Sequence, residues 1–172
     1  MEKVLLLFLT LTSQIAFTQN SYHTYLSLRY SYSIEYSSSF AKQSIIGKNI
    51  DFKVADREGN SIIVVVKKLL TQEEDMTITD ILNIPSSSWE ANVQLPNVKV
   101  IKKGEVSVDS RKGMFLHYTS KGIDSPMTLY HTNYFFLFEG YLYNLSATCD
   151  INDISKMQPI FFRALQSFTF PD

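Results

Sequence analysis

The chain has 172 residues, with 16 Lys and Arg against 17 Asp and Glu, and its formal net charge is −1. Because nucleic-acid-binding domains are usually basic, this balance gives no reason to expect a nucleic-acid partner. The length suits one domain that buries roughly two-thirds of its unfolded surface. Cys149 is the only cysteine in the sequence, so an internal disulfide is excluded.

The start of the chain has the features of a secretory signal peptide. Lys3 precedes the apolar run Val4–Leu11, and the small residues Ala16 and Thr18 suit a cut before Gln19. The apolar run is shorter than the roughly 20 residues that a membrane-spanning helix needs. We therefore expect residues 1–18 to be removed, rather than kept as an anchor, and expect no transmembrane segment in the mature chain.

The first half of the remaining chain has the alternation of β-strands. Residues 22–36 predict one strand or two short ones, and residues 49–70 predict a hairpin. Its turn is Asp56–Asn60, where Gly59 or Asn60 can take a positive φ.

Two short helices are predicted in the middle of the chain. The first is capped by Thr77 or Thr79 and ends before Pro85. The second covers residues 86–94, with Ser87 or Ser88 as its cap and Trp89 as its anchor.

Strands return in the second half. Residues 98–108 predict a strand with a bulge at Gly104, and residues 113–120 predict the next one. Residues 126–149 predict an aromatic hairpin that turns at Glu139-Gly140. Its first strand carries apolar residues on both faces, so it should be an interior strand covered on both sides.

The C-terminal segment changes to helical spacing. The residues Ile154, Met157, Phe161, Leu165 and Phe168 form one apolar stripe. The pair Ser155 and Gln158 fits a capping box, with Pro159 near the helix start. Because short turns imply antiparallel pairing, the elements together predict an α+β domain over residues 19–172, with about six or seven strands.

The order of these elements resembles the PsbP-like superfamily, which includes the DcrB-like secreted bacterial proteins. The resemblance rests on the opening YSIEYSSSF, the hairpin, the helical insert with Trp89, the long meander and the closing PIFFRALQSFTF. It implies an α/β/α sandwich around a central antiparallel sheet, closed by the C-terminal helix. It also implies an accessory or binding protein without a catalytic constellation, although a fold alone does not supply a function.

Two histidines are the main candidates for chemistry. His117 and His131 fall on adjacent predicted strands, where two imidazoles could ligate a metal or one could act as a base. Neither HxH nor HExxH spacing is present, and no third ligand is evident. The pattern therefore favours two histidines that belong to the sheet, and whether they meet depends on register.

Other polar motifs have simple structural explanations beside their functional ones. Cys149 precedes a predicted helix start, which would lower the pKa of its thiol, but a buried small residue is the commoner case. The acidic run Glu73–Asp75 lacks the spacing of an EF-hand and suits a solvated loop. The pairs Lys67-Lys68 and Lys102-Lys103 could contact an anion or protect strand edges.

Two further motifs depend on context. Asn144–Ser146 fits a glycosylation sequon, which matters only in a eukaryotic secretory pathway. Tyr130 and Tyr134 could form an exposed tyrosine patch that binds a partner or a sugar ring, although a core role is favoured.

The expected protein is a secreted or periplasmic, non-catalytic accessory or binding module of the bacterial cell envelope. Its expected partner is an envelope protein, and no catalytic, cofactor-binding or metal-binding residue is assigned. The alternative is a small hydrolase or metal-dependent enzyme that uses His117 or His131.

Overall fold

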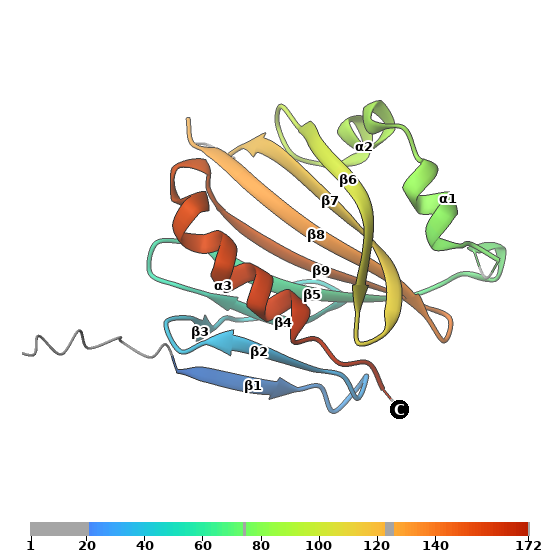
Figure 1. Ribbon diagram of the computed structural model, residues 1–172, viewed down its shortest axis with the longest axis horizontal. Coiled ribbons are helices and arrows are strands. Elements are labelled where there is room, and N and C mark those ends of the chain that lie inside the picture. The colour runs from blue at the N-terminus through green and yellow to red at the C-terminus, as the bar shows by residue number, and fades with distance from the viewer. Residues whose placement is uncertain (1–20, 74, 123–125, 172) are drawn as a thin grey trace, which may run out of the picture.

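The computed structural model describes residues 21–73, 75–122 and 126–171, so the predicted signal peptide lies outside it. A seven-stranded antiparallel sheet has the order β3-β4-β5-β9-β8-β7-β6, and β1 and β2 form a separate pair (Figure 1). The strands are β1 (Tyr22–Leu26), β2 (Ser33–Ser37), β3 (Ala41–Lys42), β4 (Ile50–Ala55), β5 (Ser61–Lys68), β6 (Lys99–Val108), β7 (Arg111–Lys121), β8 (Thr128–Phe138) and β9 (Tyr141–Asp150). The predicted segment 22–36 is therefore two strands.

The predicted hairpins are confirmed, and their turns show why. In the β4–β5 turn, the Asp56 carboxylate accepts backbone hydrogen bonds from Glu58 and Asn60, each at 2.9 Å, and Gly59 has φ 89°. In the β8–β9 turn, Glu139 and Gly140 have φ 48° and 75°. Two successive positive φ angles match the right-handed twist of the strands that they connect.

The bulge in β6 is not where the sequence placed it. The register with β7 shifts between Val100 and Lys102, which leaves Ile101 as the extra residue. Gly104 has another role, since a Cβ atom there would lie 2.8 Å from the Phe115 ring. The prediction of a bulge at Gly104 is wrong because that glycine makes room for a ring on the neighbouring strand.

The helical insert contains a short 3₁₀ turn (Thr71–Glu73), α1 (Ile78–Asn83) and α2 (Ser86–Asn92). Thr77 caps α1, as one of the two predictions had it, and Asp80 completes a capping box. The cap of α2 was wrongly predicted: the helix starts at Ser86, its N-cap is Pro85, and no side chain caps it. Ser87 and Ser88 thus lie inside the first turn, and the helix ends two residues earlier than expected.

The closing helix α3 (Ile154–Gln166) follows a 3₁₀ turn (Ile151–Asp153). Its predicted capping box is also wrong, because Ser155 and Gln158 both lie within the helix and Asp153 occupies the N-cap without a side-chain bond. The capping bond lies one turn earlier, where the Asp150 carboxylate accepts from the Asn152 N–H at 2.8 Å. The apolar stripe is confirmed within the helix, where Met157, Phe161, Ala164 and Leu165 are buried. Phe168, the last predicted member, lies beyond the helix end at Gln166 but is buried in the same core.

Helices cover both faces of the sheet and produce two separate cores. On one face, α3 and β2 close a large core, and a bridge between Ser33 and Thr169 ties β2 to the chain after α3 (Figure 1). On the other face, α1 and α2 cover a smaller core of Ile81, Met114, Leu116, Tyr118 and Phe135. The α/β/α sandwich is confirmed, with β8 an interior strand buried on both faces.

Within the described residues, the helices all fall short of the length and apolar character that crossing a bilayer requires.

Candidate functional site

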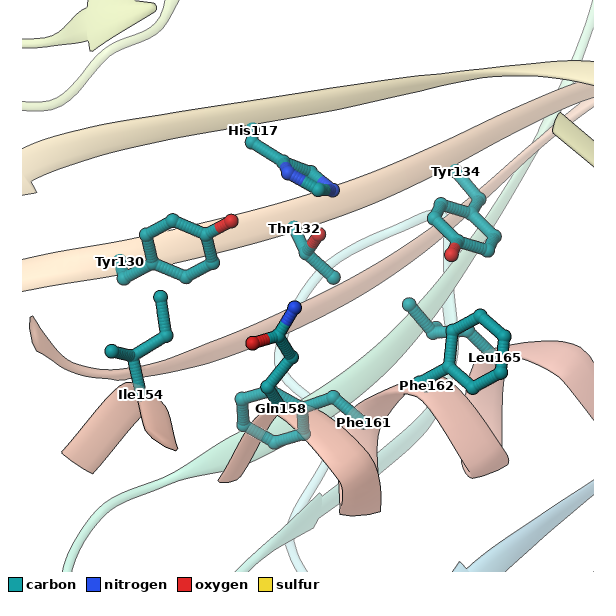
Figure 2. A pocket seen from close by; sticks show the side chains of 9 residues that line it. All are labelled: His117, Tyr130, Thr132, Tyr134, Ile154, Gln158, Phe161, Phe162 and Leu165. Atoms are coloured by element: carbon teal, nitrogen blue, oxygen red, sulfur yellow. The ribbon is translucent and has the colours of Figure 1, made fainter. Parts of the chain in front are cut away.

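A cavity of about 60 Å³ lies between α3 and the strands β7 and β8 (Figure 2). Its lining residues come from three elements, the neighbouring strands β7 and β8 and the helix α3. The strands contribute His117, Tyr130, Thr132 and Tyr134, and the helix contributes Ile154, Gln158, Phe161, Phe162 and Leu165. The site is therefore an apolar cavity with a few polar groups, which is the usual composition of a small-ligand pocket.

His117 stands on the strand side of the cavity. It pairs across the sheet with Thr132, and its ring lies 4.9 Å from the Phe115 ring and 5.8 Å from the Tyr130 ring between centroids. Burial, with a smaller contribution from the Lys102 charge, lowers the pKa of His117. The imidazole is therefore neutral at pH 7 and offers one donor and one acceptor nitrogen.

The polar groups beside His117 are neutral as well. Burial raises the pKa of both Tyr130 and Tyr134, so their hydroxyls stay protonated. Thr132 lies between them on β8, and Gln158 extends its amide from α3 toward Thr132 (Figure 2). No carboxylate occurs among the nine lining residues, so the site contains no acid–base couple.

The tyrosines do not form the exposed patch that was considered as an alternative. Tyr134 is 7 % exposed and Tyr130 is half-buried. The exposed aromatic residue of the site is Phe162, at 59 %, on the outer side of α3. The helix thus covers the tyrosines and leaves one ring at the mouth of the cavity.

His131 lies on the opposite face of the sheet and does not meet His117. It pairs across strands with Tyr118, against which its ring stacks at 4.5 Å with an interplanar angle of 10°. Its Nε2 lies 2.8 Å from Ser120 Oγ and its Nδ1 lies 3.0 Å from Thr148 Oγ1. Burial lowers the pKa of His131 to about 4, so this histidine is a neutral, hydrogen-bonded member of the smaller core.

Cys149 is buried and points into the larger core. Burial, together with the charges of Asp153 and Asp150, raises the pKa of its thiol to about 11. The lowered thiol pKa that a helix start would cause is not found. A 3₁₀ turn separates Cys149 from α3, and the carboxylates of Asp150 and Asp153 lie nearby.

The charged motifs divide into structural and exposed members. Lys67 pairs with Glu73 at 3.1 Å, and Glu73 also accepts from the Leu70 N–H, whereas Glu74 lies outside the described residues. Lys103 donates to the Leu82 and Ile84 carbonyls at the end of α1. Its neighbour Lys102 is exposed, on the same face as His117.

The remaining sequence motifs belong to the scaffold. Asn144 accepts a hydrogen bond from Asn133 at 2.9 Å, and Ser146 donates to Asn133 at 3.3 Å. Across residues 21–73, 75–122 and 126–171, no group of three His, Cys, Asp or Glu side chains is placed to hold a metal ion.

The sequence did not identify the helix side of the cavity. Gln158 and Phe162 lie off the apolar stripe of α3 and are exposed. The sequence signal that could have found it was Phe162, because an apolar ring on the polar side of an amphipathic helix can mark an interaction site.

No protein-family model and no curated protein matches the sequence. Several solved structures share its fold. The PsbP protein of the cyanobacterium Synechocystis sp. PCC 6803, CyanoP, is 14 % identical, with a TM-score of 0.66 over 94 % of this chain and 99 % of its own.

Two other structures are similar over most of their length. LpqN, described as involved in cell envelope biogenesis of Mycobacterium tuberculosis, is 9 % identical, with a TM-score of 0.58 over 91 % of this chain and 88 % of its own. PA94 of Pseudomonas aeruginosa, a protein of unknown function described as a putative regulator, is 14 % identical, with a TM-score of 0.56 over 88 % of this chain and 97 % of its own. The chain therefore has the PsbP-like fold.

Proposed function

We propose that this protein is a secreted, non-catalytic binding module of the bacterial cell envelope, and that it meets a protein partner at the surface around the α3 cavity. One observation carries the proposal: the cavity joins apolar walls to neutral polar groups, and its single imidazole has no carboxylate beside it. Such a lining suits recognition, since acid–base chemistry uses groups whose pKa values are set apart by their surroundings.

The separation of the two histidines supports binding over hydrolysis. An enzyme that used both would need them in one cleft, whereas His117 and His131 lie on opposite faces of the sheet. His131 already has hydrogen-bond partners for both ring nitrogens. The imidazole that remains available is His117, which the cavity presents as a neutral hydrogen-bonding group.

The envelope location rests on the sequence. The apolar run Val4–Leu11 and the small residues before Gln19 suit export and cleavage. LpqN, which shares the fold at 9 % identity, is a protein of cell envelope biogenesis, and this is consistent with the proposal. Fractionation of cells that express the full chain tests it. A mature protein outside the cytoplasm that begins at Gln19 is expected, and an uncut cytoplasmic chain would contradict it.

The partner surface is tested by capture from envelope extract with two matched variants. Phe162 and Leu70 are each 59 % exposed, so replacing either by Glu should leave the fold intact. Phe162 lies at the cavity and Leu70 lies beside Glu73, away from it. We expect Phe162→Glu to lose the partner that the unmodified protein and Leu70→Glu both retain. Equal capture by all three would place the interface elsewhere.

A further inference from the structure

The bulge in β6 places two lysines beside the cavity. In a regular strand, residues three apart point to opposite faces. The extra residue, Ile101, changes this, so that Lys99 pairs with Thr119 and Lys102 pairs with His117. Because Thr119 and His117 are two residues apart on β7, both lysines lie on the α3 face, and bulges commonly redirect side chains in this way next to functional sites.

The two lysines continue rows of residues that end in the cavity. Across the strands, Lys102 is followed by His117 and then Thr132, and Lys99 is followed by Thr119 and then Tyr130. Lys102 Nζ lies 5.6 Å from the centre of the Phe115 ring, which itself contacts His117. Positive charge therefore stands one strand away from the polar groups of the cavity.

The other charges on this face do not cancel that charge at the cavity. Lys121 pairs with Thr128 in the next row and donates to its hydroxyl at 3.0 Å, which adds a third cation. Asp153, at the N-cap of α3, acts on the Cys149 thiol, and no carboxylate is among the residues that line the cavity. The one described charge that acts on His117 is that of Lys102, its cross-strand partner.

The cavity also has polar groups without partners. Among the described residues, no hydrogen bond involves the His117 ring or the Gln158 amide, and Figure 2 shows both directed into the space between α3 and β8. The walls around them are rings and aliphatic chains from Tyr130, Phe161 and Leu165. A cavity of about 150 Å³ holds a whole benzene ring. The enclosed space here is about 60 Å³, so it admits only part of a ring, and the apolar part of a ligand is limited to a single ring that stays partly outside.

We propose that this cavity binds a small free carboxylic acid whose apolar part is no larger than one ring. The apolar part lies under α3, and the carboxylate faces Lys99 and Lys102 and accepts a hydrogen bond from His117. This inference rests on the proposed binding function and names a ligand for the same site. The acid is not the protein partner, so failure of acid binding and failure of partner capture are distinguishable.

The test is calorimetric titration of the purified protein with phenylacetate and its neutral counterpart phenylacetamide. We expect saturable binding of phenylacetate, and binding of the amide at least tenfold weaker. Binding of phenylacetate should weaken with added salt, because exposed charges are screened. Naphthylacetate should bind no better than phenylacetate. Equal affinity for the acid and the amide, or no saturable binding of the acid, would overturn the proposal.

Matched variants locate the charge and the site. Lys99→Gln together with Lys102→Gln should weaken phenylacetate binding at least tenfold. Lys112→Gln removes an exposed lysine of β7 whose place in the strand alternation gives it the opposite face, and it should stay within twofold. In NMR spectra the His117 ring signals should move on binding while those of His131 stay fixed. Equal losses in both lysine variants, or tighter binding of a peptide that ends in Phe, would contradict a free-acid site.

Discussion

The two faces of the sheet use the same kind of residue in opposite ways. On the α1 and α2 face, His131 is 5 % exposed, hydrogen-bonded at both nitrogens and stacked on Tyr118. On the α3 face, His117 is half-buried and lines a cavity. The first face is a closed core, and the second is a core that leaves a recess beside its helix.

This difference follows from how each face is covered. Tyr118 and Thr148 are the cross-strand partners of His131, and Ser120, which pairs with Leu129, reaches its Nε2 diagonally. The sheet itself therefore satisfies that imidazole. His117 has Thr132 and Lys102 as its neighbours, neither of which bonds to its ring among the described residues. The side chains on the neighbouring strands thus decide whether a histidine in a sheet is hydrogen-bonded within the core or free to bind a ligand. The sequence of its own strand does not show this.

The largest expected effect is on the helix that roofs the cavity. Phe161 is 3 % exposed in the larger core, and Phe161→Ala should lower the free energy of unfolding by about 3–5 kcal/mol. The next residue, Phe162, is 59 % exposed, and Phe162→Ala should cost under about 1 kcal/mol. Denaturant unfolding measures both. Similar losses in the two variants would mean that α3 is rotated about its axis.

The second prediction separates the two histidines by pH. The folded pKa of His131, about 4, lies below its ordinary value of 6.5, so the unfolded chain binds the proton more readily between these pH values. The contribution of neutral His131 to the free energy of unfolding is therefore fully present above pH 6.5. It is lost as the pH decreases to about 4, and the loss is up to about 3 kcal/mol.

Two variants isolate that contribution from the titration of carboxylates. His131→Gln removes the titrating group, so its stability should fall less between pH 7 and pH 4 than that of the unmodified protein. His117→Gln should change the pH dependence in the same direction but by less, because His117 is only half-buried. Unfolding free energies across this pH range measure the difference, and equal slopes for the two variants would remove the distinction between the faces.

The third prediction concerns how tightly the larger core packs against β7. A Cβ atom on Gly113 would collide with the Phe136 ring and the Phe135 carbonyl oxygen. Because a backbone carbonyl cannot rotate away, Gly113→Ala should cost about 1–3 kcal/mol. At Gly104 the neighbour is the Phe115 ring alone, which can turn, so Gly104→Ala should cost less. The reverse order in denaturant midpoints would show that the α3 face is looser than described.

Local patterns predicted the elements, and long-range pairing decided the site. The aromatic alternation of β8, the turn at Glu139-Gly140 and the stripe of α3 are local signals, and each was correct. The bulge at Ile101 was missed because register depends on the partner strand. The cavity was missed because Gln158 and His117 meet only after the helix folds back onto the sheet.

The smallest expected effect concerns α1, one of the two helices that cover the smaller core. Thr77 accepts from the Asp80 N–H, and Asp80 accepts from the Thr77 N–H, which together fix the start of α1 above Ile81. Thr77→Ala should therefore cost about 1 kcal/mol, as is usual for a lost N-cap. Ser87 makes no cap bond to α2, so Ser87→Ala should change stability by less than about 0.5 kcal/mol. Equal costs for the two substitutions in denaturant unfolding would contradict the predicted role of the capping box. The packing of α1 and α2 on the sheet would then depend on burial of Ile81 and Trp89 rather than on the cap.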